Sequence, residues 1–214
     1  MNTYQTLQQK ALGLAFILGP LLLVIGAATV VLGIGLTPFG TDSWVDGVLS
    51  AYGFLLMIPI GFELARRLGQ RAPFFGIVCA ILGLGAGMSI VASAAKIIQM
   101  GIIDAGLNES IWNVMTHPSF ALVMLPSILS LLNISLLGVG FLWKGGLSRL
   151  ASGMLILSGI FYFAGVAGGA EIATLQTHVL TPLATLLYFL ALAPLGLRYL
   201  AGEIPENELE MATA

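Results

Sequence analysis

The chain has 214 residues, of which 58% are hydrophobic and 8% are charged, with a formal net charge of −2. A soluble domain normally carries about 25% charged residues, so this composition excludes an ordinary water-soluble globule. Lipid is the alternative solvent, and there roughly 20 apolar residues cross the hydrocarbon core as a helix. The net charge suggests no nucleic-acid partner. The single cysteine, Cys79, excludes a disulfide framework and a cysteine-based metal site.

Three long apolar stretches in the first half of the chain predict membrane-spanning helices at about 11–36, 46–66 and 73–103. The first stretch is well beyond the roughly 7–15 apolar residues of a signal peptide, so we interpret it as a retained span. The third would be about 45 Å long as one helix. Because that length exceeds the hydrocarbon thickness, this helix must tilt or protrude.

The second half predicts three further helices, at about 118–143, 149–171 and 181–198. Thr181 followed by Pro182 is typical of an N-cap and first helical residue, so we expect the last helix to begin there. We divide the chain into a six-helix transmembrane domain, 1–200, and an acidic tail, 201–214, predicted to be disordered.

The basic residues fix an expected orientation. Seven of the eight lie at the N-terminus, in the second or fourth connection, or at the end of the last helix: Lys10, Arg66, Arg67, Arg71, Lys144, Arg149 and Arg198. Short segments rich in Lys and Arg stay cytoplasmic. The sequence therefore predicts both termini inside a bacterial inner membrane, with Lys96 as the exception.

Small and polar residues within the spans predict helix packing. Glycines four residues apart, Gly83/Gly87 and Gly165/Gly169, let helix backbones approach closely. We expect them to pack the third helix on the fifth, with a ligand cavity or a dimer seam as the alternative. On the fourth helix, three polar residues spaced three apart predict hydrogen bonds to a neighbour, or else a polar cavity lining: Ser127, Ser130 and Asn133.

Ionisable residues within spans usually face the bundle interior or water. Glu63 and Arg67 are four apart and predict a local ion pair. Lys96 and Glu171 lie at similar depth, counted from the inner starts of parallel helices, so we predict that they pair near the outer membrane edge. The alternative is that Lys96 extends to the outer headgroups.

Both histidines, His117 and His178, precede expected outer helix starts. With Glu171 and Asp104 they are candidate metal ligands, and two histidines on different helices also raise haem ligation. The spacing matches no metal motif, so no cofactor is predicted and hydrogen bonding to loops is the favoured interpretation. No nucleophile elbow or phosphate-binding loop is present.

Two basic segments resemble an uncharacterised family of small bacterial six-helix membrane proteins. The first is Arg66-Arg67-Leu68-Gly69-Gln70-Arg71, and the second is Trp143-Lys144-Gly145-Gly146-Leu147-Ser148-Arg149 with the residues that follow it as far as Gly153. The resemblance implies the architecture of most of the chain. It implies no activity and no catalytic residue.

The leading hypothesis is a non-enzymatic membrane protein that binds or moves a small apolar or amphipathic ligand. Its expected site is an outward-facing one formed by Lys96, Glu171, His117 and His178. Two alternatives remain open. The first is a structural or accessory subunit of a larger membrane complex, and the second is an intramembrane metal- or haem-dependent enzyme. The expected partners are the lipid bilayer, a small apolar ligand, and either further copies of the chain or a larger membrane complex.

Overall fold

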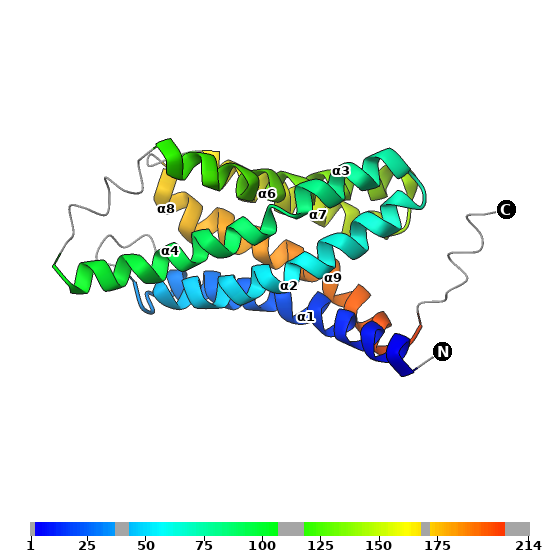
Figure 1. Ribbon diagram of the computed structural model, residues 1–214, viewed down its shortest axis with the longest axis horizontal. Helices are drawn as coiled ribbons and strands as arrows, with labels where there is room; N and C mark the ends of the chain where they lie inside the picture. Colours follow the sequence, from blue (N-terminus) through cyan, green and yellow to red (C-terminus); the bar gives the residue numbers. More distant parts are fainter. Residues whose placement is uncertain (1–2, 37–42, 107–117, 168–171, 204–214) are drawn as a thin grey trace.

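The computed structural model describes residues 3–36, 43–106, 118–167 and 172–203. These residues form α-helices, one π-helical segment and short connections (Figure 1). The elements are α1 (Thr3–Val31), α2 (Trp44–Gly69), α3 (Pro73–Gly83), α4 (Ala86–Asp104), α6 (Pro118–Lys144), α7 (Arg149–Ala167), α8 (Ala173–Leu175), η2 (Gln176–Leu180) and α9 (Thr181–Ala201).

Five helical segments are long and apolar enough to cross a membrane. They are Thr3–Val31, Trp44–Gly69, Pro73–Asp104, Met124–Lys144 and Ala173–Ala201, and the described part of α7, Arg149–Gly165, is a shorter apolar helix. The all-α class and the multi-pass arrangement predicted from composition are therefore confirmed at this level.

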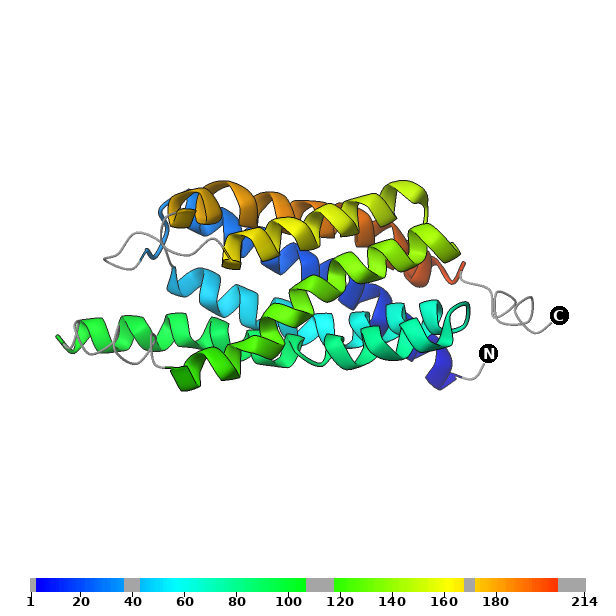
Figure 2. The same ribbon diagram turned by 90° about the horizontal axis from the view of Figure 1, so that it is seen from above.

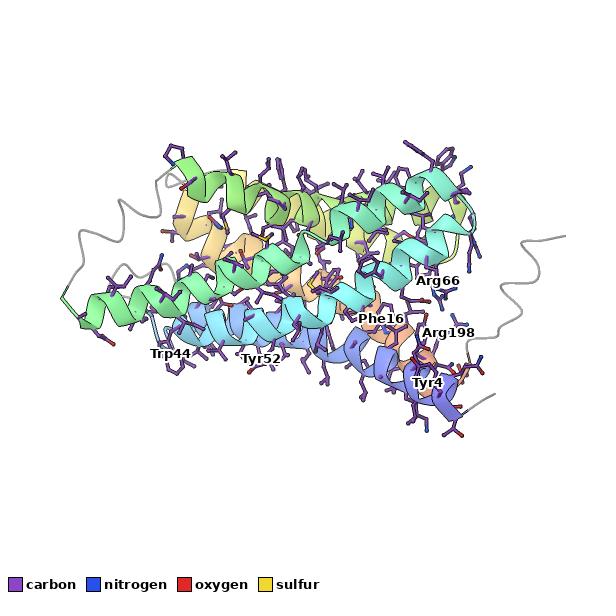
Figure 3. The ribbon with its side chains drawn as sticks, in the orientation of Figure 1. Tyr4, Phe16, Trp44, Tyr52, Arg66 and Arg198 are labelled. Carbon is purple, nitrogen blue, oxygen red and sulfur yellow. The ribbon has the colours of Figure 1, made fainter. Side chains whose placement is uncertain are left out.

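The helices pack as a closed ring. α1 lies between α2 and α9, α7 lies between α9 and α6, and α3 with α4 joins α6 back to α2. The start of α1 and the end of α9 lie at one end, where Figure 3 also places Arg66 and Arg198, and Trp44 marks the other. We call these the basic end and the opposite end. The ring encloses a core of fully buried side chains that includes Phe16, Leu23, Ile60, Leu64, Leu155 and Leu192.

The third span is broken, which the apolar pattern did not indicate. α3 ends at Gly83 and α4 begins at Ala86, with Leu84 and Gly85 between them. A Cβ built on Gly85 would lie 1.9 Å from the carbonyl oxygen of Pro126, so only glycine lets this turn touch the backbone of α6. Beyond the break, α4 extends past the rest of the bundle (Figures 1 and 2), as the predicted excess length requires.

The α-helix α9 begins at Thr181, as predicted, but Thr181 is not its N-cap. The helical segment runs from Ala173 through η2 into α9, and the amide of Thr181 donates to the carbonyl of Gln176, five residues back. Pro182 has no amide hydrogen to donate, and a π-turn beside it shifts the hydrogen-bond register locally. The predicted start of α9 is therefore confirmed, but its N-cap is Leu180 and the Thr-Pro pair lies inside a longer helical segment, Ala173–Ala201.

The expected packing of the third helix on the fifth is also wrong. Among the described residues, α3 and α4 pack mainly on α2 and α6, and α7 packs on α6 and α9. A Cβ on Gly87 would meet nothing within 4 Å, and one on Gly165 would meet only the side chain of Gln176. Gly169 lies outside the described residues. Glycine spacing alone did not identify the partner helix.

Two of the three polar residues of α6, Ser127 and Asn133, bind neighbouring helices, as predicted. The hydroxyls of Ser127 and Ser89 lie 2.7 Å apart, and the side-chain amide of Asn133 donates to the carbonyl of Cys79 at 2.9 Å. Ser130 donates to the carbonyl of Ser127, within its own helix. These buried bonds join α6 to both parts of the broken span.

Candidate functional site

The basic end holds a buried carboxylate, Glu63, surrounded by donors. Arg66 donates to both of its oxygens, at 2.8 Å from Nε and 2.7 Å from Nη2. Arg67 donates from Nε at 2.9 Å, and the hydroxyl of Tyr199 on α9 donates to the same oxygen, Oε1. The predicted Glu63–Arg67 pair is thus confirmed as part of a larger cluster. Two guanidinium groups and one carboxylate leave the cluster with a net positive charge.

A pocket of about 500 Å³ lies beside this cluster at the basic end. Its apolar lining, called here the floor, comes from Leu150, Ala151 and Met154 of α7 and Leu190, Ala191, Pro194 and Leu195 of α9. Its charged lining, called here the rim, consists of Arg67, Arg71, Arg198 and Glu203. A lining that combines apolar side chains with three arginines is suited to a molecule with an apolar body and an anionic head.

The rim arginines differ in how far other groups already engage them. Arg67 binds Glu63 and Tyr199, whereas the one hydrogen bond of the Arg71 side chain to another described residue is a long one, 3.3 Å to the carbonyl of Lys144. Among the described residues, neither Arg71 nor Arg198 forms an ion pair. Arginine forks bind carboxylate and phosphate bidentately, so these two side chains are the ones suited to an added anion.

The opposite end holds a second buried carboxylate, Asp46, in the first turn of α2. Lys96 of α4 donates to its Oδ2 at 2.5 Å, and Ser50 donates to its Oδ1 at 2.8 Å. The Asp46 side chain is 9% exposed and that of Lys96 is 30% exposed. Ser43 caps the same helix by accepting bonds from the amides of Val45 and Asp46. An acidic residue in a first turn is also favoured by the helix dipole.

The backbone of α1 closes over the Asp46–Lys96 pair. A Cβ built on Gly26 would lie 2.6 Å from Oδ1 of Asp46, and one on Gly47 would lie 3.1 Å from the Cβ of Lys96. Glycine at these positions lets α1, α2 and α4 converge on the ion pair. The pair therefore joins α2 to α4 at the opposite end, with α1 packed closely against it.

The predicted ligand and metal residues are only partly within the described chain. Glu171 and His117 lie outside it, so the Lys96–Glu171 pair stays a prediction. His178 is exposed in η2, with Nδ1 at 3.0 Å from Thr177 Oγ1 and 3.2 Å from the Thr174 carbonyl. Asp104 ends α4. Within the described ranges, no three of His, Cys, Asp and Glu gather as a metal site would require.

Sequence reasoning missed two features of these sites. Asp46 was not considered as a site residue, although Ser43 three residues earlier is a helix N-cap signal that places it in a first turn. The arginines were used to assign orientation and, for Arg67, to predict a local ion pair. Their convergence on one pocket depends on α7 and α9 being neighbours, which local sequence patterns do not reveal.

Fold and composition together define the class as a multi-pass membrane helix bundle. Comparison of the chain with protein-family models, with curated proteins and with solved structures returned no match. The family resemblance noted in the two basic segments therefore stays a prediction, and function has to be argued from the site itself.

Proposed function

We propose that this chain is a six-span protein of a bacterial inner membrane that binds a small amphipathic anion in the pocket between α7 and α9. The observation that carries the proposal is the apolar floor of that pocket, rimmed by Arg71 and Arg198. The apolar body of the ligand packs against α7 and α9. Its anionic head accepts hydrogen bonds from the two guanidinium groups at the membrane surface.

The orientation supports this placement. The basic end faces the cytoplasm under the charge rule, and the 19 residues of α7 give about 28 Å of helix, close to the hydrocarbon thickness. With α7 as the sixth span, both termini are cytoplasmic and the pocket opens to the inner leaflet. Lys96, the cation of the expected outward-facing site, is engaged by Asp46. We therefore place the ligand at the basic end.

Binding of dodecyl phosphate to the purified full-length protein tests the site, with monoolein as the uncharged comparison. Arg198→Gln should weaken dodecyl phosphate binding about tenfold, because a charge-assisted hydrogen bond contributes roughly 1.5–3 kcal/mol. Ala151→Trp should fill the floor and weaken both probes.

The matched control is Arg149→Gln, since Arg149 is an exposed arginine at the same end that does not line the pocket. It should leave both probes unaffected. Equal losses in Arg198→Gln and Arg149→Gln would refute a specific site, as would monoolein binding that is as sensitive to Arg198→Gln as dodecyl phosphate binding.

The orientation is tested by cysteine labelling in intact cells. Cys79 is buried and gives little background. A membrane-impermeant maleimide should label Asp42→Cys and spare Gln70→Cys. Labelling of the second alone would reverse the orientation and place the pocket on the outside.

A further inference from the structure

Two lateral grooves flank α2 at the basic end, and both are lined by the same two residues, Phe62 and Arg66. The groove between α1 and α2 has a volume of about 590 Å³ and that between α2 and α3 about 340 Å³. Their remaining walls are mostly apolar. The first is lined by Gln8, Ala11, Leu12, Ala15, Leu56, Pro59 and Glu63, and the second by Ala65, Gly69, Pro73, Gly76, Ile77 and Ala80.

The larger groove has the length of half a bilayer. On α2 it runs from Leu56 to Arg66, which is about 15 Å at 1.5 Å per residue. The hydrocarbon core is about 30 Å thick, so the groove extends from headgroup level at Arg66 to near the midplane. That is the depth of one acyl chain of the inner leaflet.

Arg66 stands where the two grooves meet and has donor capacity to spare. Glu63 engages its Nε and Nη2, whereas a guanidinium group carries five N–H donors in all. The Arg66 side chain is 52% exposed, whereas that of Arg67 is 12% exposed. Since both guanidinium groups share one carboxylate, the excess positive charge of the cluster is presented at Arg66.

We infer that a diacyl anionic phospholipid binds across α2, with one acyl chain in each groove and its phosphate bound by Arg66. Phe62, one turn from Arg66 and 44% exposed, separates the two chains. Two apolar grooves that converge on one cation match a lipid with two chains and one anionic head. A single-chain amphiphile would leave one groove empty. This site is separate from the α7–α9 pocket, which includes neither Phe62 nor Arg66.

The test is native mass spectrometry of the full-length protein with added dioleoyl phosphatidylglycerol, compared with dioleoyl phosphatidylcholine and oleoyl lysophosphatidylglycerol. The wild-type protein should retain the diacyl anionic lipid in preference to both comparison lipids. Arg66→Gln should lower its affinity about tenfold through loss of a charge-assisted hydrogen bond. Arg66→Lys should recover part of it by restoring the charge.

Two control variants separate this site from its surroundings. Arg149→Gln removes an equivalent exposed charge, and Arg198→Gln disrupts only the α7–α9 pocket, so both should retain phosphatidylglycerol normally. Failure of the pocket proposal would thus leave this result unaffected.

Two groove-filling variants test the two-chain geometry. Ala11→Trp and Ala80→Trp, one in each groove, should each reduce diacyl binding and leave lysophosphatidylglycerol binding unchanged. The inference is overturned if Arg66→Gln behaves like Arg149→Gln, or if the single-chain and diacyl lipids bind the wild-type protein equally. Should Arg66→Gln fail to fold, the groove-filling variants decide the question by themselves.

Discussion

The two ends of the bundle each hold a buried carboxylate of α2 bound to cations, and they use it in opposite ways. At the basic end, Glu63 is shared by Arg66 and Arg67, three and four residues away on the same helix. At the opposite end, Asp46 is bound by Lys96, which lies fifty residues away on another helix. The first arrangement is redundant and lies within one helix, whereas the second joins two helices.

This difference separates stability from binding. A carboxylate with two guanidinium groups leaves positive charge available to a ligand, and the α7–α9 pocket and both lateral grooves border that charge. A carboxylate matched by one ammonium group leaves no net charge. Under the two binding proposals above, ligands bind at the basic end, and the opposite end holds helices together.

The most damaging change should be the loss of the cation at the opposite end. Lys96→Met leaves Asp46 buried without its ammonium partner, and breaking a buried ion pair from one side costs about 3–5 kcal/mol. Unfolding in mixed micelles of increasing sodium dodecyl sulfate fraction measures this loss.

A double-substitution cycle shows whether the loss comes from pairing. Asp46→Asn combined with Lys96→Met should be milder than the sum of the single changes, and strictly additive losses would exclude the coupling. The same cycle with Glu171→Ala tests the predicted Lys96–Glu171 pair. Coupling there as well would mean that Lys96 serves two carboxylates.

The next largest effect should come from the glycine that closes over Asp46. Gly26→Ala places a methyl group 2.6 Å from Oδ1 of Asp46. Overpacking of this kind costs about 1–3 kcal/mol. Gly87→Ala is the matched control, because a Cβ there meets nothing within 4 Å. The same unfolding assay should show Gly87→Ala neutral or stabilised. Equal destabilisation by both variants would contradict the tight convergence of α1 on the ion pair.

At the basic end, Arg67 should matter more than its neighbour. Arg67→Ala removes bonds to Glu63 and Tyr199 and a guanidinium stacked 5.0 Å from the Tyr199 ring centre. We expect a loss of about 1.5 kcal/mol, the lower range for a hydrogen bond to a charged group, because Arg66 still pairs with Glu63. Tyr199→Phe, which retains the stacking, should cost less. A larger loss of stability in Tyr199→Phe than in Arg67→Ala would show that the hydrogen bond from Tyr199 to Glu63 contributes more than Arg67 does.

Local sequence patterns predicted the helical segments. They did not predict features of the fold that depend on contacts between helices. Apolar length placed the spans, and the i,i+4 spacing predicted the Glu63–Arg67 pair. The break at Gly85 has no proline to signal it and depends on the approach of Pro126 from α6. Thr181 and Pro182 predicted the start of α9 but did not reveal the π-helical segment that precedes it.

The candidate sites were less predictable, because each combines residues from helices distant in sequence. Asp46 and Lys96 meet only because α2 packs on α4. The pocket requires α7 and α9 to be neighbours and also draws Arg67 and Arg71 from the α2–α3 region. Charge asymmetry predicted which end these arginines share, but not that they border a pocket.

Substitution of Arg66 should have the smallest effect on stability of these changes and a clear effect on lipid binding. Its side chain is half exposed and its carboxylate partner retains Arg67, so Arg66→Ala should destabilise the fold by less than about 1 kcal/mol. The same change removes the excess charge between the two lateral grooves and should release phosphatidylglycerol. Lys96→Met should do the reverse, weakening the fold while sparing the affinity for the lipid. Measuring unfolding and lipid retention on both variants tests the assignment directly, because a variant that moved both quantities together would show that the two ends do not divide these roles.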